Sequence, residues 1–269
     1  MSATTAIAAR LLAAHDAAGL TELPSQRDAP FDLPAAFAVA DTLRALRIAR
    51  GERPLGYKIG FTNRGIWQRY GVHAPIWGQV WSSTVQRLTG TVAQASLGGL
   101  SQPRLEPEVV FGFRATPRAG MSLVELQACL SWVAHGFEIV HTHFDGWRFC
   151  AADTVADFAL HGRLFIGPAV PTDDWPSMAD DLAAMRVTLS CDGQQMDSGV
   201  GAIVLDGPLN ALRLWVDAMA LHTPAWHIEA GDVVTTGTIT DAWPLSPGQA
   251  WTTTLSEERL KPLTLNTAA

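Results

Sequence analysis

A change in the character of the chain near Leu55 constrains its fold more than any other feature. Before this point, residues 3–18 and 34–50 are rich in alanine, carry apolar residues at helical spacing and are each followed by a glycine, which predicts two helices joined by a loop. After it come short apolar runs separated by Gly and Pro: GYKIGF, PEVVFGF, GFEIV, RLFIG, MRVTLSC, GDVVTT and AWTTTL. Helices and strands do not alternate regularly, which disfavours a doubly wound parallel sheet and predicts an α+β fold.

Two further helices are expected within the strand-rich part. One spans about 122–134, with Leu126, Leu130 and Val133 at helical spacing, and the other follows Pro208. Asp192-Gly193 lies between two strand-like runs and predicts a hairpin. We therefore expect a helical N-terminal part, residues 1–55, and a β-rich catalytic core, residues 56–269.

Composition excludes several classes of protein. With 19 Lys and Arg against 26 Asp and Glu the net charge is −7, and no basic run is present, so a nucleic-acid partner is not expected. The sequence has no apolar run long enough to span a membrane and no secretory signal at its start, so we expect no membrane partner and a cytoplasmic location. Three cysteines without a CxxC pair indicate neither a disulfide scaffold nor a four-cysteine zinc site. The sequence also lacks GxGxxG, GxxxxGK[ST], GxSxG and HExxH.

The most informative segment is the run from Leu105 to Phe113. Side chains alternate across a strand, so Glu106 and Glu108 share one face of it and the apolar residues share the other. If that face is exposed, the two are ordinary surface glutamates. If it is buried, their repulsion requires a proton or a cation between them.

Two other lone charges lie in apolar strand-like runs. Glu138, in GFEIV, is either an edge-strand residue facing water or a third carboxylate of an oxygen-ligated Mg²⁺ or Mn²⁺ site. Lys58, in GYKIG, is either a snorkelling lysine or the charge that completes such a site. Three glutamates, one divalent cation and one lysine sum to zero charge.

Six motifs occur in an order that is typical of one family: GYKIGFTN with YGVHAPIWG, EPEVVFGF, EIVHTHFDGW, DTVADFALHG, AGDVVTTGT and PGQ. Together they resemble the fumarylacetoacetate hydrolase superfamily, and within it the 2-keto-4-pentenoate hydratase / 4-oxalocrotonate decarboxylase branch. The resemblance covers about residues 50–260. It implies a mixed β-sheet roll or barrel core of the fumarylacetoacetate hydrolase type, an Mg²⁺ or Mn²⁺ cofactor and a homo-oligomer.

The resemblance also assigns roles to individual residues. It implies metal ligands at Glu106, Glu108 and Glu138; catalytic residues at Lys58, Asp157 and His143; and substrate-binding residues at Ile76, Gly237 and Thr238. Ile76 stands where many members have an aspartate, and His141-Thr142-His143 stands where they have Asp-Ser-Arg. The missing arginine argues against a second, distal carboxylate on the substrate.

The histidines near these motifs are less certain in role. His143 replaces the family arginine and is the preferred pocket residue, ahead of His141 and His161. If the strand continues regularly past Val140, His141 and His143 face away from Glu138, and a structural role is the alternative for each.

The function that the resemblance implies is addition of water to a 2-hydroxy-dienoate, or its 2-oxo-enoate tautomer, to give a 4-hydroxy-2-oxo acid in the catabolism of aromatic ring-cleavage products. The substrate would be a small 2-oxo acid. The alternatives are decarboxylation of a 2-oxo-enedioate such as 4-oxalocrotonate, hydrolysis of a C–C bond in an acylpyruvate, and a non-catalytic relic of the fold.

Overall fold

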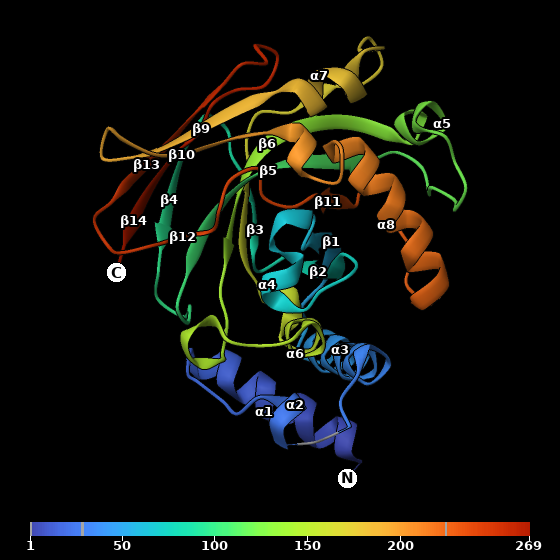
Figure 1. Cartoon of the computed structure of the whole chain (residues 1–269), viewed down its shortest axis with the longest axis vertical. Helices are drawn as coiled ribbons and strands as arrows, with labels where there is room; N and C mark the ends of the chain where they lie inside the picture. The colour runs from blue at the N-terminus through green and yellow to red at the C-terminus, as the bar shows by residue number, and fades with distance from the viewer. Residues whose placement is uncertain (1, 28–29, 224) are drawn as a thin grey trace.

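The computed structural model describes residues 2–27, 30–223 and 225–269, and two β-sheets form its core (Figure 1). The larger sheet has nine strands in the order β2-β1-β11-β5-β6-β7-β3, with β12 paired to β5 and β8 to β6. Its strands are β1 (Pro54–Gly60), β2 (Ile76–Trp81), β3 (Val85–Arg87), β5 (Arg104–Phe113), β6 (Leu130–Val140), β7 (His161–Ile166), β8 (Val170–Pro171), β11 (Val233–Thr235) and β12 (Trp243–Pro244).

The smaller sheet has five strands in the order β10-β9-β13-β14-β4. They are β4 (Val92–Ser96), β9 (Arg186–Cys191), β10 (Gln194–Val200), β13 (Ala250–Leu255) and β14 (Thr264–Ala268). Strands β9 and β10 pair as the hairpin expected at Asp192-Gly193. Pairs β1–β11, β3–β7 and β4–β14 are parallel and the others antiparallel, so the mixed-sheet α+β class is confirmed.

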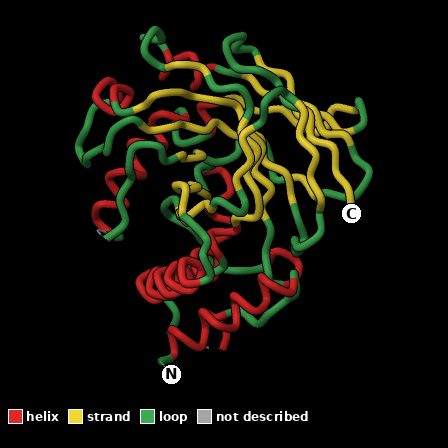
Figure 2. The backbone as a smooth tube through the Cα atoms, turned by 180° about the vertical axis from the view of Figure 1, so that it is seen from behind, coloured by secondary structure: helices red, strands yellow, loops and turns green. Residues whose placement is uncertain are grey.

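The two sheets pack face to face over an apolar cluster. Leu105, Phe137 and Phe165 of the larger sheet contact Trp251 and Leu265 of the smaller one. All five are buried, and Figure 2 shows the strands of both sheets gathered in one region of the molecule. Since these side chains occupy one face of their strands, the opposite face of β5 and β6 is left for other residues.

Helices lie around the two sheets (Figure 1). They are α1 (Ala3–Ala17), α2 (Pro24–Arg27), α3 (Leu33–Ala49), α4 (Trp67–Tyr70), α5 (Leu123–Ala128), α6 (Ala151–Ala156), α7 (Met178–Ala184) and α8 (Pro208–His222), with short 3₁₀ turns at Arg64–Ile66, Asp145–Trp147, Phe158–Leu160 and Gly201–Ile203. Helices α7 and α8 pack over the cluster around Trp215. No helix in the described part of the chain is long and apolar enough to cross a membrane.

The N-terminal helices lie together at one end of the molecule (Figure 1). Ser2 and Asp32 cap α1 and α3 by accepting backbone N–H groups at the first turn. Both helices share a buried cluster with α6, which includes Leu11, Val39 and Val155. The loop expected between them contains the four-residue helix α2, and residues 28 and 29 of that loop lie outside the described residues.

The helix expected over about 122–134 is wrong. Helix α5 begins there, with Ser122 and Glu125 forming a capping box, but it ends at Ala128, and β6 begins at Leu130. Leu126, Leu130 and Val133 match a helical period by coincidence. Register along β5 shows why a strand forms: β6 pairs with β5 from Leu130 to Val140, and this ladder places Val133, Phe137 and Ile139 in apolar clusters.

Candidate active site

The pairing of β5 with β6 brings three glutamates together. Glu106 lies directly opposite Glu138, and Glu108 is two residues further along the same face of β5. Each carboxylate offers an oxygen within 4.8 Å of the others. Glu108 and Glu138 are fully buried, and Glu106 is half-buried. The face they share is therefore a buried one.

Curvature of the sheet brings Lys58 to the same place. Strands β11 and β5 separate β1 from β6, and the register aligns Lys58 with Ala134, four residues before Glu138. A flat sheet would therefore hold the backbones of Lys58 and Glu138 about 20 Å apart at the usual strand spacing and rise per residue. In the structure the Lys58 Nζ lies 3.2 Å from Glu138 Oε2, and the lysine is buried. The concave face of the curled sheet thus holds all four charges.

The chain after β11 fixes the position of Glu108. Its Oε2 accepts hydrogen bonds from the Thr235 hydroxyl and from the Gly237 N–H, the latter at 2.9 Å. Gly237 has φ +101°, and a Cβ there would lie 1.9 Å from Thr62 Oγ1, so only glycine fits this approach. The other oxygen of Glu108, Oε1, is buried and has no hydrogen-bond partner.

Lys58 and the three glutamates shift one another's pKa values. Burial raises the pKa of all three glutamates, and attraction to Lys58 lowers it. Repulsion from the neighbouring carboxylates adds to the rise for Glu106 and Glu108. The net shift is upward for each, and it takes the pKa of Glu108 to about 8. Burial lowers the pKa of Lys58, but attraction to the three carboxylates outweighs it and the net shift is upward. One lysine cannot balance three carboxylates. The unpartnered Glu108 Oε1 and the all-oxygen donor set fit a divalent cation of the Mg²⁺ or Mn²⁺ kind.

His161 orients the third glutamate. Its Nδ1 lies 2.8 Å from Glu138 Oε1 and its Nε2 lies 2.7 Å from the Thr84 hydroxyl. Burial, together with the nearby positive charges of Lys58 and Arg47, lowers the pKa of His161 well below its usual value, so the ring is neutral. A neutral ring that donates from Nδ1 to the carboxylate accepts from Thr84 at Nε2. The sequence motifs place His161 near the site but do not indicate that it orients Glu138.

A cavity opens onto the group from one side. Its lining comprises Lys58, Gly60, Phe61, Thr62, Asn63, Ile66, Ile76, Arg104, Glu106, Val140, Trp147, Phe149, Ala159, Leu160, Gly237, Thr238, Thr240, Asp241 and Ala242. Five of the nine residues singled out from the sequence are among these: Lys58, Ile76, Glu106, Gly237 and Thr238. Glu108 and Glu138 lie behind them. The Gly237 N–H is donated to Glu108 and the Thr238 hydroxyl to the Thr240 carbonyl.

Arg104 is a lining residue that sequence analysis missed. Its guanidinium carbon lies 4.2 Å from the centre of the Trp147 ring, and Trp147 lines the same cavity. The signal was available, because Arg104 shares the strand face of Glu106 and Glu108 by the same period of two.

His143 and Asp157 lie side by side, away from the cavity lining. The His143 Nδ1 is 2.5 Å from Asp157 Oδ1, and both residues are fully buried. Residues 158–160 follow Asp157, and Ala159 and Leu160 line the cavity. His143 and Asp157 do not line the cavity themselves, and residues 158–160 connect Asp157 to it. The catalytic roles expected for both residues stay predictions.

Comparison with known proteins places the chain in a family. It is 33% identical over 214 residues to a 2-hydroxyhexa-2,4-dienoate hydratase of Comamonas testosteroni, covering 79% of this chain and 78% of that protein. It is 32% identical over 238 residues to a 2-keto-4-pentenoate hydratase of Burkholderia vietnamiensis, covering 87% and 86%. A 4-oxalocrotonate decarboxylase of a Pseudomonas species is 29% identical over 206 residues, covering 77% and 76%. No family model matches the chain.

Solved structures share the fold. A 4-oxalocrotonate decarboxylase from Pseudomonas putida G7, complexed with magnesium and adipate, superimposes with a TM-score of 0.89 at 23% identity over 98% of this chain and 97% of that one. A fumarylpyruvate hydrolase from Pseudomonas aeruginosa, in complex with Mn²⁺ and pyruvate, gives 0.61 at 14% identity over 80% and 89%. The fold is that of the fumarylacetoacetate hydrolase superfamily. Within it, the chain belongs to the family of 2-keto-4-pentenoate hydratases and 4-oxalocrotonate decarboxylases.

Proposed function

We propose that the protein is a divalent-metal-dependent hydratase that adds water to a 2-hydroxy-dienoate, or to its 2-oxo-enoate tautomer, and yields a 4-hydroxy-2-oxo acid. The observation that carries this proposal is the group of three glutamates and Lys58 beside a cavity that Lys58 and Glu106 line together with both polar and apolar residues. Relatives named as dienoate and pentenoate hydratases support the same reaction.

Glu106, Glu108 and Glu138 would hold the cation, and Mg²⁺ or Mn²⁺ suits their oxygens. Structures of the same fold hold magnesium or Mn²⁺, which supports the choice. When bound, such an ion supplies a Lewis acid for the keto oxygen and carboxylate of a 2-oxo acid.

The chain's own residues provide the rest of the chemistry. Lys58 lies 3.2 Å from Glu138 and lines the cavity, and its ammonium would donate to the enolate oxygen or the substrate carboxylate. Loss of the enol proton leaves charge on that oxygen and makes the far carbon, C5, basic, so a proton adds at C5 and gives the conjugated 2-oxo-3-enoate. Water then adds across C3=C4, with its hydroxyl on C4 and its proton on C3. Phe61, Ile66 and Ile76 line the cavity and would hold the hydrocarbon tail.

A second candidate is decarboxylation of a 2-oxo-enedioate. Arg104 favours this candidate, because its guanidinium lines the same cavity as Lys58. It could bind a distal carboxylate of the substrate in place of the family arginine, which is His143 in this chain. A decarboxylase among the relatives is consistent with this candidate.

A panel of 2-oxo acids decides between the candidates. Metal-free protein with added Mg²⁺ would be given 2-hydroxy-penta- and -hexa-2,4-dienoate, 4-oxalocrotonate and an acylpyruvate, while dienol absorbance and CO₂ release are recorded together. Loss of the dienol without CO₂, with a 4-hydroxy-2-oxo acid as product, is the expected result. CO₂ from 4-oxalocrotonate alone would establish the second candidate, and cleavage of the acylpyruvate alone would contradict both.

A further inference from the structure

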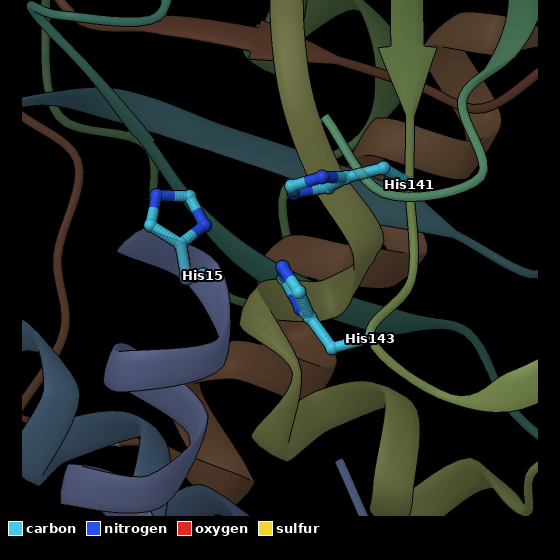
Figure 3. A group of neighbouring side chains, drawn as sticks. All are labelled: His15, His141 and His143. Carbon is cyan, nitrogen blue, oxygen red and sulfur yellow. The ribbon is translucent and has the colours of Figure 1, made fainter. Parts of the chain in front are cut away.

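Three histidines meet at a second point in the molecule, apart from the glutamates. His15 comes from the end of α1, and His141 and His143 come from the segment that follows β6; Figure 3 shows their rings turned toward one another. The ring centres of His141 and His143 are 4.7 Å apart, and each lies 5.6 Å from that of His15. One nitrogen of each ring lies within 4.8 Å of the other two.

The facing nitrogens are buried and lack partners. None of the three makes a hydrogen bond: they are Nδ1 of His15, Nε2 of His141 and Nε2 of His143. The side chains of His141 and His143 are at most 1% exposed. A buried polar atom without a partner destabilises the folded protein, and three of them converge on one point here. The arrangement therefore indicates a missing ligand that all three imidazoles share.

Asp157 prepares His143 to bind a metal. The aspartate accepts the His143 Nδ1–H at 2.5 Å, which leaves the lone pair on Nε2, the nitrogen that faces the other two rings. Asp157 is itself held by the Thr142 hydroxyl and the His143 N–H, each at 3.0 Å. A carboxylate that orients a histidine in this way is the usual support of a histidine ligand to zinc.

Charge around the group is compatible with a cation. Burial lowers the pKa of His15 to about 4, with the charge of Arg47 adding to the shift, and burial lowers the pKa of His141 well below its usual value. The rings of His15 and His141 are therefore neutral. Arg47 is paired with Glu52 at 2.6 Å, and Asp157 adds a negative charge beside His143. His15 also lines a cleft with Arg50 and Ser83 that gives access from solvent.

We propose that His15, His141 and His143 form a second metal site that binds Zn²⁺ or a similar transition-metal ion and ties α1 to the segment that follows Glu138. Three imidazoles favour such an ion over Mg²⁺, whereas three carboxylates form a donor set that suits Mg²⁺ or Mn²⁺. Nitrogens bound to one tetrahedral zinc are about 3.3 Å apart, so the rings close inward on binding. His141 must then carry its proton on Nδ1 and give up the contact of 3.3 Å that this nitrogen accepts from the Ser101 N–H.

Cobalt and zinc titrations test the site without reference to catalysis. Untagged, chelator-treated protein is first saturated with Mg²⁺ to fill the glutamates, and Co²⁺ is then added as a spectroscopic probe, with Zn²⁺ measured by calorimetry. One equivalent of Zn²⁺ should bind, the Co²⁺ form should show the visible absorption of a tetrahedral nitrogen site, and Zn²⁺ should raise the melting temperature.

Variants assign the binding to these residues. His15→Ala, at a partly exposed helix end, should weaken Zn²⁺ binding about 100-fold or more, and Asp157→Asn should weaken it about 10- to 100-fold. His73→Ala, an exposed histidine outside the group, and Glu106→Gln should bind Zn²⁺ as the wild type does. Folding of each variant is checked by its metal-free melting curve. Absence of Zn²⁺ binding to the wild type, or binding that His15→Ala leaves unchanged, would overturn the proposal whatever the outcome of the hydratase assay.

Discussion

Glu106 is the one of the three glutamates that lines the cavity, and it is the least buried of them. Its carboxylate can therefore be neutralised with the least damage to folding. We expect Glu106→Gln to raise the Mg²⁺ concentration needed for half-maximal activity by about tenfold or more, because one ligand charge is lost. Excess Mg²⁺ should restore part of the activity. A variant whose activity is lost at every Mg²⁺ concentration would show that Glu106 does more than bind metal.

Substitution of Lys58 should affect activity in a different way. Lys58→Met keeps most of the side-chain stem and removes the charge 3.2 Å from Glu138. If Lys58 stabilises the developing enolate, kcat should fall about 100-fold or more, as for loss of one preorganised donor. Metal affinity should stay level or rise, since a neighbouring positive charge is gone. Excess Mg²⁺ should therefore not rescue this variant, and a kcat within a few-fold of wild type would exclude the assigned role.

For single residues, the sequence predicts which face of a strand a side chain occupies better than it predicts which residue that side chain contacts. The period of two along β5 places Glu106 and Glu108 together, and the same rule would have included Arg104. The ion pair between Lys58 and Glu138 could not be read from either strand alone. It depends on the curvature of a sheet in which two other strands separate β1 from β6.

At the scale of elements, helix α3 is fixed to the sheet through a buried charge. Arg47 of α3 is 2% exposed, donates to Glu52 at 2.6 Å and 3.1 Å, and lies 4.4 Å from the ring of Trp81 at the end of β2. Removing the carboxylate leaves the arginine buried without its counter-charge. Glu52→Gln should therefore lower the free energy of unfolding by about 2 kcal/mol in chemical denaturation. Glu22→Gln, which breaks an exposed pair with Arg27, is the control and should change it by less than about 0.5 kcal/mol.

The same pair predicts a dependence on pH. Partial burial would raise the pKa of Glu52, but hydrogen bonds from Arg47 and Ser83 and the charge of Arg47 outweigh it and lower the pKa to about 2. The unfolded chain then binds the proton more readily, so stability from Glu52 is complete above pH 4.5 and is lost as the pH falls toward 2. Unfolding curves of wild type and Glu52→Gln should converge over that range. A constant difference between them down to pH 2 would contradict this account.

Strand β6 shows why one end of an element can be mispredicted while its other end is not. Leu126, Leu130 and Val133 satisfy a helical period, and only the long ladder with β5 decides for a strand after Cys129. Glu138 lies further along, where GFEIV alternates in a way that no helix explains. The part of β6 that contains Glu138 was therefore predicted as a strand from local pattern, and its beginning was not.

At the scale of the whole molecule, the sequence predicts the class of fold and not its topology. Strand runs and helical runs can be recognised singly, but β1 pairs in parallel with β11, whose residues come far later in the chain. Such pairings depend on which apolar faces must be buried together. The family resemblance supplied the curled sheet that local pattern could not, while the division of the chain at residue 55 stays a prediction.

An apolar groove on the surface bears on the assembly of the molecule. It lies between α3 and α8 and is lined by Leu33, Phe37, Trp77, Ala218 and Trp226, among others. Close to it on α8, Leu221 is 75% exposed. A groove lined by large apolar side chains, with an exposed leucine beside it, is the kind of surface that an interface between protein chains covers. A second copy of the same chain is the partner that the family resemblance implies.

We therefore expect a homo-oligomer in solution, with this groove in the interface. Light scattering at micromolar concentration should give a whole-number multiple of 28.9 kDa. Leu221→Asp should lower that mass or weaken the assembly, because a charge would be buried at the contact. Val92→Asp is the matched control: Val92 is 56% exposed on β4, and Figure 1 shows β4 on the side of the molecule away from α8. A mass of 28.9 kDa for the wild type would refute the oligomer. An equal effect of the two substitutions would show that the groove is not where the copies meet.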